Sequence, residues 1–354
     1  MTNAWRNERL YILLAVFVIL VNVAIFMAGP QKKPVAAAKG SVPAQVIEET
    51  RRKSAESVFL KREELEGLLR DDKTLAVTLN LATLLILAVF LLGLLIDVFL
   101  IVLKSEKRGI DIRTGEALGA VRWGLRDVAK VVVLFLFFGY ALVLIESFLA
   151  GVCPLIKNNN LRMMANSLVL DALAVVFIIY FTVGQYQEKL VSLGLSAKNF
   201  VKNAYYGIVG YLAAVPLLVG IVAATALIAS ALNYVPEKQA VVRLFMQEDD
   251  TRFLLFASLF AAVLGPVVEE IFFRGFLYNA IKKRIGLFWG MAATSAAFAA
   301  LHAHPVGFLP IMVIGMLLAY LYEKTGTLVA PITAHIIHNV SMVGFVFLIK
   351  QLQV

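Results

Sequence analysis

Long apolar runs recur along the whole chain and are separated by short segments rich in Lys and Arg. Several runs exceed the roughly 18–20 residues that a helix needs to cross a bilayer. None shows the two-residue alternation of a membrane barrel strand. The pattern predicts an all-α, polytopic transmembrane helical bundle. We expect about nine spans, near residues 11–28, 76–103, 131–152, 166–185, 206–232, 253–280, 287–302, 308–322 and 328–349.

Composition agrees with a membrane location, since 60% of the residues are hydrophobic. The net charge of +9 raises the question of a nucleic-acid partner. However, Lys and Arg lie mostly in loops beside spans, where positive charge sets orientation. We therefore expect no nucleic acid and a cytoplasmic N-terminus. The ten basic residues of segment 30–75 argue the other way, because this orientation places that segment outside.

The chain divides by chemistry. We expect an anchor helix or signal at 1–29, a charged extramembrane linker and helix at 30–75, scaffold helices at 76–249 and a functional module at 250–349. All four histidines lie in that module, at positions 302, 304, 335 and 338. The lone Cys153 excludes an intrachain disulfide.

Three ionisable groups lie in the apolar stretch "VVEEIFFRGF", residues 267–276. A charge at mid-bilayer costs about 2.5–3.5 kcal/mol, so these groups should face protein or water. Glu270 and Arg274 are i,i+4 neighbours and can pair. Glu269 points about 100° away and is left as a candidate general base. A buried ionic lock between helices is the structural alternative.

The histidines favour a catalytic site. His302 ends the predicted span 287–302, one turn after Phe298, and the loop that follows it lacks Lys, Arg, Asp and Glu. His335 and Asn339 share a helical face, so their N–H groups can converge on one oxygen, as in an oxyanion hole. His304 and His338 are expected to be bystanders.

Together these groups are the parts of a hydrolase that activates water directly. The motifs of other intramembrane hydrolases are absent, namely the H-E-x-x-H zinc helix, the G-x-S-x-G and G-x-S-G serine motifs and the G-x-G-D aspartyl motif.

Three motifs resemble those of a known family. "EEIFFR" at 269–274 resembles E-E-x-x-x-R, "FAALH" at 298–302 resembles F-x-x-x-H, and "HIIHN" at 335–339 resembles H-x-x-x-N. The family is the type II CAAX prenyl endopeptidase and bacteriocin-processing group, called CPBP or Abi intramembrane proteases. The resemblance covers about 250–349. It implies a core of about eight helices, to which the first helix and segment 30–75 are additions.

By that resemblance, the catalytic residues fall into two pairs. Glu269 with His302 would activate the water, and His335 with Asn339 would form the oxyanion hole. The supporting residues would be Glu270, Arg274 and Phe298. Members have been described both as metalloproteases and as glutamate-dependent enzymes without metal. We favour no cofactor; the alternative is Zn²⁺ held by Glu269, His302 and His335.

The resemblance implies an intramembrane endopeptidase in contact with membrane lipid, in the bacterial inner membrane. Its expected substrate is a small membrane-anchored or lipid-modified peptide, or a C-terminally anchored protein.

Two other functions stay open. One is an ion-coupled transporter with a midplane site at Glu269, Glu270 and Arg274, to which Asp97, Glu146 and Asp171 could add a proton path. The other is a non-catalytic bacteriocin-immunity or scaffold member. The protease hypothesis carries one difficulty, because span counting places His302 at the end of its helix away from Glu269. A shared cavity needs a re-entrant 303–307 loop or different helix boundaries.

Overall fold

The computed structural model describes residues 8–28, 67, 69–106, 119–149, 158–234 and 239–351, and within these ranges it contains helices and no strand. Eight helices of this described part are long and apolar enough to cross a membrane, which confirms the all-α polytopic bundle. Residues 30–66 of the predicted linker segment 30–75 lie outside the described residues, as does Cys153.

The described part of the chain contains eleven α-helices. They are α1 (Glu8–Ala28), α3 (Lys73–Ser105), α4 (Leu125–Leu149), α5 (Asn159–Ile179), α6 (Phe200–Ala231), α7 (Ala240–Gln247), α8 (Thr251–Leu259), α9 (Gly265–Glu270), α10 (Asn279–Leu301), α11 (Phe308–Thr325) and α12 (Val329–Gln351). Three π-helical segments, η3 (Tyr180–Gln185), η5 (Phe260–Leu264) and η6 (Ile271–Tyr278), and a 3₁₀ turn, η4 (Leu190–Leu193), join or extend them.

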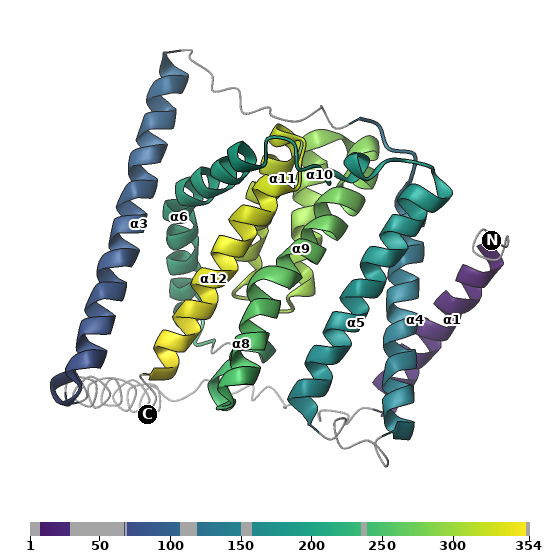
Figure 1. Ribbon diagram of the computed structural model, residues 1–354, viewed down its shortest axis with the longest axis horizontal. Helices are drawn as coiled ribbons and strands as arrows, with labels where there is room; N and C mark the ends of the chain where they lie inside the picture. The colour runs from purple at the N-terminus through teal and green to yellow at the C-terminus, as the bar shows by residue number, and fades with distance from the viewer. Residues whose placement is uncertain are drawn as a thin grey trace, which may run out of the picture.

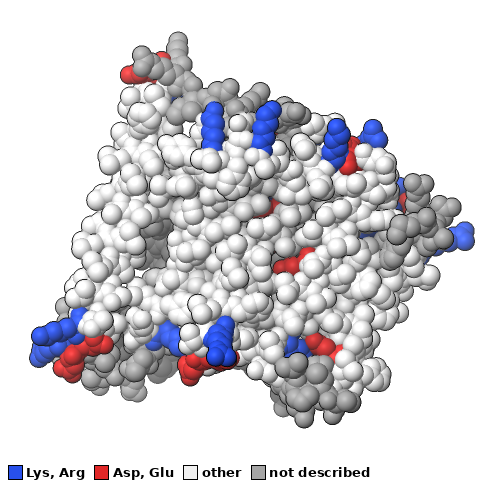
Figure 2. Space-filling view, in the orientation of Figure 1, with Lys and Arg blue, Asp and Glu red and all other residues white. Residues whose placement is uncertain are grey.

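The helices stand side by side in a broad bundle (Figure 1). α3 stands at one end and contacts α6, whereas α1 and α4 pair at the other end. Between them, α6 contacts α11 and α12, and α5 joins α4 to α9. Figure 2 shows charged side chains gathered along two opposite edges, with an almost uncharged belt between them. That belt fits the hydrocarbon layer of a membrane, and the two edges fit its interfaces.

The segment predicted as a separate span at 287–302 is the short arm of a hairpin. Gly286 lies inside α10 with a φ of 78°, a left-handed conformation that glycine adopts without strain, and reverses the chain there. The arm that follows, residues 287–301, is about 22 Å long at 1.5 Å per residue. It falls short of the roughly 30 Å hydrocarbon layer. The arm therefore ends inside the membrane.

Close helix packing holds the site-bearing helix α12 against α6. A Cβ atom on Gly207 of α6 would lie 2.4 Å from the Ala330 carbonyl oxygen and 2.9 Å from the Thr333 Cβ. A Cβ on Gly220 of the same helix would meet nothing within 4 Å. Only a glycine therefore allows this approach at 207.

We expect Gly207→Val to destabilise the protein by about 1–3 kcal/mol through overpacking. Gly220→Val is the matched control and should be close to neutral. The difference is measured as the fraction of each variant that stays monodisperse after heating, by size-exclusion chromatography in detergent. Equal losses for the two variants would contradict this packing account.

Candidate active site

The two glutamates lie on a short helix between two π-helical segments. α9 follows η5 and precedes η6, so the backbone widens on both sides of Glu269 and Glu270. Pro266 contributes to the first widening, because proline has no amide hydrogen for the carbonyl one turn earlier. π-segments are frequent at functional sites. The Gly265-Pro266 pair was the signal in the sequence for this irregular backbone. The prediction of a single span at 253–280 did not include the two π-helical segments.

Glu270 and Arg274 form the ion pair that their spacing predicts. Arg274 Nη1 lies 2.5 Å from Glu270 Oε1, and their side chains are 1% and 0% exposed. The second guanidinium nitrogen donates to the Gly315 carbonyl at 3.0 Å. The ring of Phe298 lies 4.8 Å from the guanidinium carbon. Each charge is thus compensated, as a buried pair requires.

His335 bridges the two glutamates from α12. Its Nδ1 lies 2.9 Å from Glu270 Oε1, and its Nε2 lies 3.6 Å from Glu269 Oε2. A neutral imidazole that donates Nδ1–H to Glu270 keeps a lone pair on Nε2, whereas an imidazolium donates from both nitrogens. When Nε2 carries a proton, it can donate to an oxyanion.

Glu269 is the carboxylate without a strong partner. Its Oε2 is buried and accepts no hydrogen bond from the described residues. Its side chain is nevertheless 37% exposed, whereas that of Glu270 is fully buried. A reactant can therefore reach Glu269 and not Glu270.

The hairpin brings His302 to the level of Glu269. Seventeen residues separate Glu269 from Gly286 and sixteen separate Gly286 from His302, so each arm is about 25 Å long at 1.5 Å per residue. The arms are antiparallel, because α10 folds back at Gly286 and contacts η6. Span counting had placed His302 at the far end of its helix. The short second arm removes that difficulty.

Phe298 joins the two imidazoles. Its ring centre lies 4.7 Å from that of His302 and 5.6 Å from that of His335. His302 Nδ1 lies 2.8 Å from the Phe298 carbonyl oxygen, a distance at which it donates. This bond fixes the tautomer and leaves the lone pair on His302 Nε2. His302 can then orient a water molecule through Nε2.

Asn339 makes a hydrogen bond that its spacing from His335 did not predict. Its Nδ2 donates to the Ala261 carbonyl oxygen in η5 at 2.8 Å. An asparagine amide has two N–H groups, and this bond uses one of them. The π-segment thus holds the side chain on the face of α12 that carries His335, and one N–H stays available to a bound oxyanion.

The two remaining histidines differ in position. His304 Nδ1 accepts the Gly307 N–H at 2.8 Å and fixes the turn after His302, which is a structural role. His338 stacks edge-on against Tyr211, with ring centres 5.9 Å apart, and its Nδ1 is buried without a partner among the described residues. It also lies within electrostatic range of His302 and His335. We predicted that His338 would be a bystander, but it lies near the other two site histidines.

An acid on a third helix also approaches the site. Asp171 is half-buried on α5, which contacts α9, and lies close enough to Glu269 for their charges to repel. It makes no hydrogen bond or ion pair with another described residue. Figure 2 shows acidic side chains at mid-height, beside α9, on a face that is otherwise uncharged. From the sequence, we considered Asp171 only as part of the proton path of an ion-coupled transporter.

The zinc alternative does not fit this arrangement. No three Asp, Glu, His or Cys side chains within the described ranges lie close enough to hold one metal ion. His335 and His302 each use Nδ1 in a hydrogen bond and keep Nε2, an arrangement that metal-bound histidines share, so these two bonds do not decide the question. We therefore derive no step through a metal, and independence from metal stays a prediction.

Comparison with known proteins places this geometry in a family context. Residues 251–341 match the sequence profile of the family described as type II CAAX prenyl endopeptidase Rce1-like. The matched range contains Glu269, His302, His335 and Asn339. The segment is CAAX-endopeptidase-like. Its helices α8 to α12 hold every candidate catalytic residue, which confirms the resemblance stated from the motifs.

One curated relative also matches. The chain is 30% identical over 83 residues to "Putative membrane peptidase YdiL" of Bacillus subtilis (strain 168), which covers 23% of this chain and 34% of that protein. The chain thus spans about a third of the length of the curated relative that it matches. No solved structure matches the chain significantly. The comparisons support a CAAX-endopeptidase-like segment within a membrane protein and leave the activity to be argued from the site.

Proposed function

We propose that the protein is an intramembrane endopeptidase. Its substrate is a small membrane-anchored or lipid-modified peptide, or a C-terminally anchored protein. One observation carries the proposal: of two adjacent glutamates at membrane depth, Glu270 is fully buried and pairs with Arg274 at 2.5 Å, while the Glu269 side chain is 37% exposed and makes no hydrogen bond with another described residue. A purely structural ionic lock would hold both carboxylates in close pairs, whereas Glu269 has His335 Nε2 only at 3.6 Å.

The proposed reaction needs no covalent intermediate. Glu269 takes a proton from a water molecule that His302 Nε2 orients, and the water oxygen bonds to the scissile carbonyl carbon. His335 and the free N–H of Asn339 donate to the oxyanion that forms. The C–N bond then breaks, and the proton held by Glu269 passes to the leaving amine. Glu270 and Arg274 hold His335 in place throughout.

Membrane proteomics tests this function without a known substrate. Cells that express the parent chain, Glu269→Ala or His302→Ala are compared for membrane peptides cleaved in or beside an apolar segment. We expect peptides that appear with the parent and are lost in both variants. Peptide patterns that are identical in all three strains would remove the catalytic hypothesis.

Asn339 supplies a further kinetic prediction. We expect Asn339→Ala to lower kcat for such a peptide by about 10²–10³-fold, the usual cost of one oxyanion donor, with little change in KM. Asn22→Ala makes the same chemical change on α1, where the amide donates to the Val18 carbonyl of its own helix, and is the matched control. A parallel rise in KM would instead assign Asn339 to substrate binding.

We also propose that the N-terminus faces the cytoplasm of a bacterial inner membrane. The start of α4 shares its edge with basic loops, since Arg122 pairs with Glu188 and Lys283 bonds to the Trp123 carbonyl. α1 begins at the same edge, where Glu8 and Arg126 line one groove. Positive loops favour the cytoplasmic side. Reporter fusions at the two ends of α1 test this orientation.

A further inference from the structure

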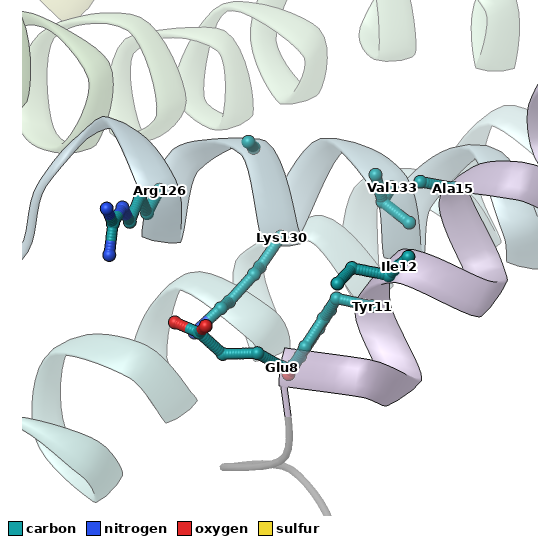
Figure 3. Close-up of a pocket in the computed structure, with 8 residues that line it drawn as sticks. Glu8, Tyr11, Ile12, Ala15, Arg126, Lys130 and Val133 are labelled. Carbon is teal, nitrogen blue, oxygen red and sulfur yellow. The ribbon is translucent and has the colours of Figure 1, made fainter.

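A groove lies between α1 and α4 where both helices begin, far along the bundle from the candidate active site (Figures 1 and 3). It has a volume of about 340 Å³. Its apolar wall consists of Tyr11, Ile12, Ala15 and Val133, and Glu8, Arg126 and Lys130 line its mouth. Ile12 is 61% exposed, so the wall is open along its length to the surrounding lipid.

The two cations at the mouth differ in how they are held. Arg126 is exposed and makes no hydrogen bond or ion pair with another described residue. The Lys130 ammonium lies 5.1 Å from the centre of the Tyr11 ring and 3.9 Å from Asp127 Oδ1. Asp127 also accepts the Tyr186 hydroxyl at 2.7 Å, so its charge is shared. Both cations can therefore serve an anion at the mouth.

We propose that this groove binds an anionic glycerophospholipid, with the phosphate at Arg126 and Lys130 and one acyl chain along Ile12 and Val133. The mouth lies in the first turns of both helices, where Glu8, Arg126 and Lys130 gather beside the apolar wall (Figure 3). Phosphates lie at that depth in a bilayer, and basic pockets between membrane helices are suited to them.

Four charged groups surround the mouth, since Arg126 and Lys130 are cations and Glu8 and the buried Asp127 are carboxylates. Asp127 is also held by the Tyr186 hydroxyl, so Arg126, which is exposed and has no described partner, is the cation most available to a phosphate. The bound lipid would also fill the space between α1 and α4, the helix on which α1 packs. This site is independent of the proposed peptidase activity.

Native mass spectrometry of the full chain, delipidated in detergent and given equal amounts of phosphatidylglycerol and phosphatidylcholine, tests the proposal. The parent should retain phosphatidylglycerol preferentially. Each lost cation should weaken that binding about fivefold, and Arg126→Gln with Lys130→Gln should weaken it about thirtyfold. Glu8→Gln should strengthen it. Because Arg126 is exposed and without a described partner, Arg126→Gln alone gives a readout that does not depend on folding.

The control is Lys104→Gln with Lys324→Gln, two exposed cations outside the groove. Equal weakening by this pair would show general surface attraction and overturn the proposal, as would equal retention of the two lipids by the parent. Glycerol phosphate, which lacks acyl chains, should not displace the bound lipid. Displacement at matched concentration would reduce the groove to an anion site and refute the lipid assignment.

Discussion

Glutamine in place of Glu269 is expected to lower the rate of peptide cleavage by about 10²–10⁴-fold, the usual contribution of a general base. The amide keeps the size of the side chain and cannot accept the proton from water. Since Glu269 Oε2 has no hydrogen bond among the described residues, the exchange should leave the fold intact. Cleavage of a peptide identified by membrane proteomics, measured with purified protein in liposomes, gives the rate.

Two variants sharpen this result. Glu269→Asp keeps a carboxylate at a shorter reach and should fall between the parent and Glu269→Gln. Glu146→Gln makes the same chemical change on α4, where Glu146 lies 3.8 Å from Arg162, and should leave the rate unchanged. A rate within a few-fold of the parent for Glu269→Gln would contradict the role of Glu269 as the general base.

Loss of one partner of the Glu270–Arg274 pair should destabilise the whole protein. Arg274→Met leaves the Glu270 carboxylate buried and uncompensated, which costs about 3–5 kcal/mol. It also removes the donor to the Gly315 carbonyl. The free energy of unfolding in mixed detergent micelles measures the loss. The double variant Glu270→Leu/Arg274→Met removes both charges and should recover a large part of it.

The exposed pair of Arg122 and Glu188 provides the comparison. The side chain of Arg122 is 68% exposed, so Arg122→Met should cost no more than about 1 kcal/mol. If Arg274→Met cost no more than this control, the buried network would not be the structural support that its geometry indicates.

Local helix geometry was sufficient to predict one part of the site from the sequence. The i,i+4 spacing fixed the pair of Glu270 and Arg274 and separated Glu269 from them, because helical periodicity needs no tertiary contact. Hydropathy found the bundle for the same reason, since each span carries its own apolar run. The family resemblance added the candidate roles of His302 and His335.

Tertiary packing decided the features that the sequence missed. The arm after Gly286 is too short to span, and this length sets the depth of His302. Asn339 bonds to Ala261, which lies in the π-segment η5. Pro266 contributes to this segment locally, but the resulting contact is made with a residue on another helix, α12. The approach of Asp171 to Glu269 arises from packing of α5 against α9. Residue spacing carries no information on such contacts.

Isotope labelling tests the central claim most directly. Purified protein in liposomes cleaves an identified peptide in H₂¹⁸O, with a metal chelator in one arm. Direct attack by water predicts one ¹⁸O atom in the new carboxyl terminus after a single turnover, none in Glu269, the same rate with the chelator, and product from Glu269→Gln only at the lowered rate. Label in the Glu269 carboxylate, or product formed by Glu269→Gln at the parent rate, would contradict water activation by Glu269.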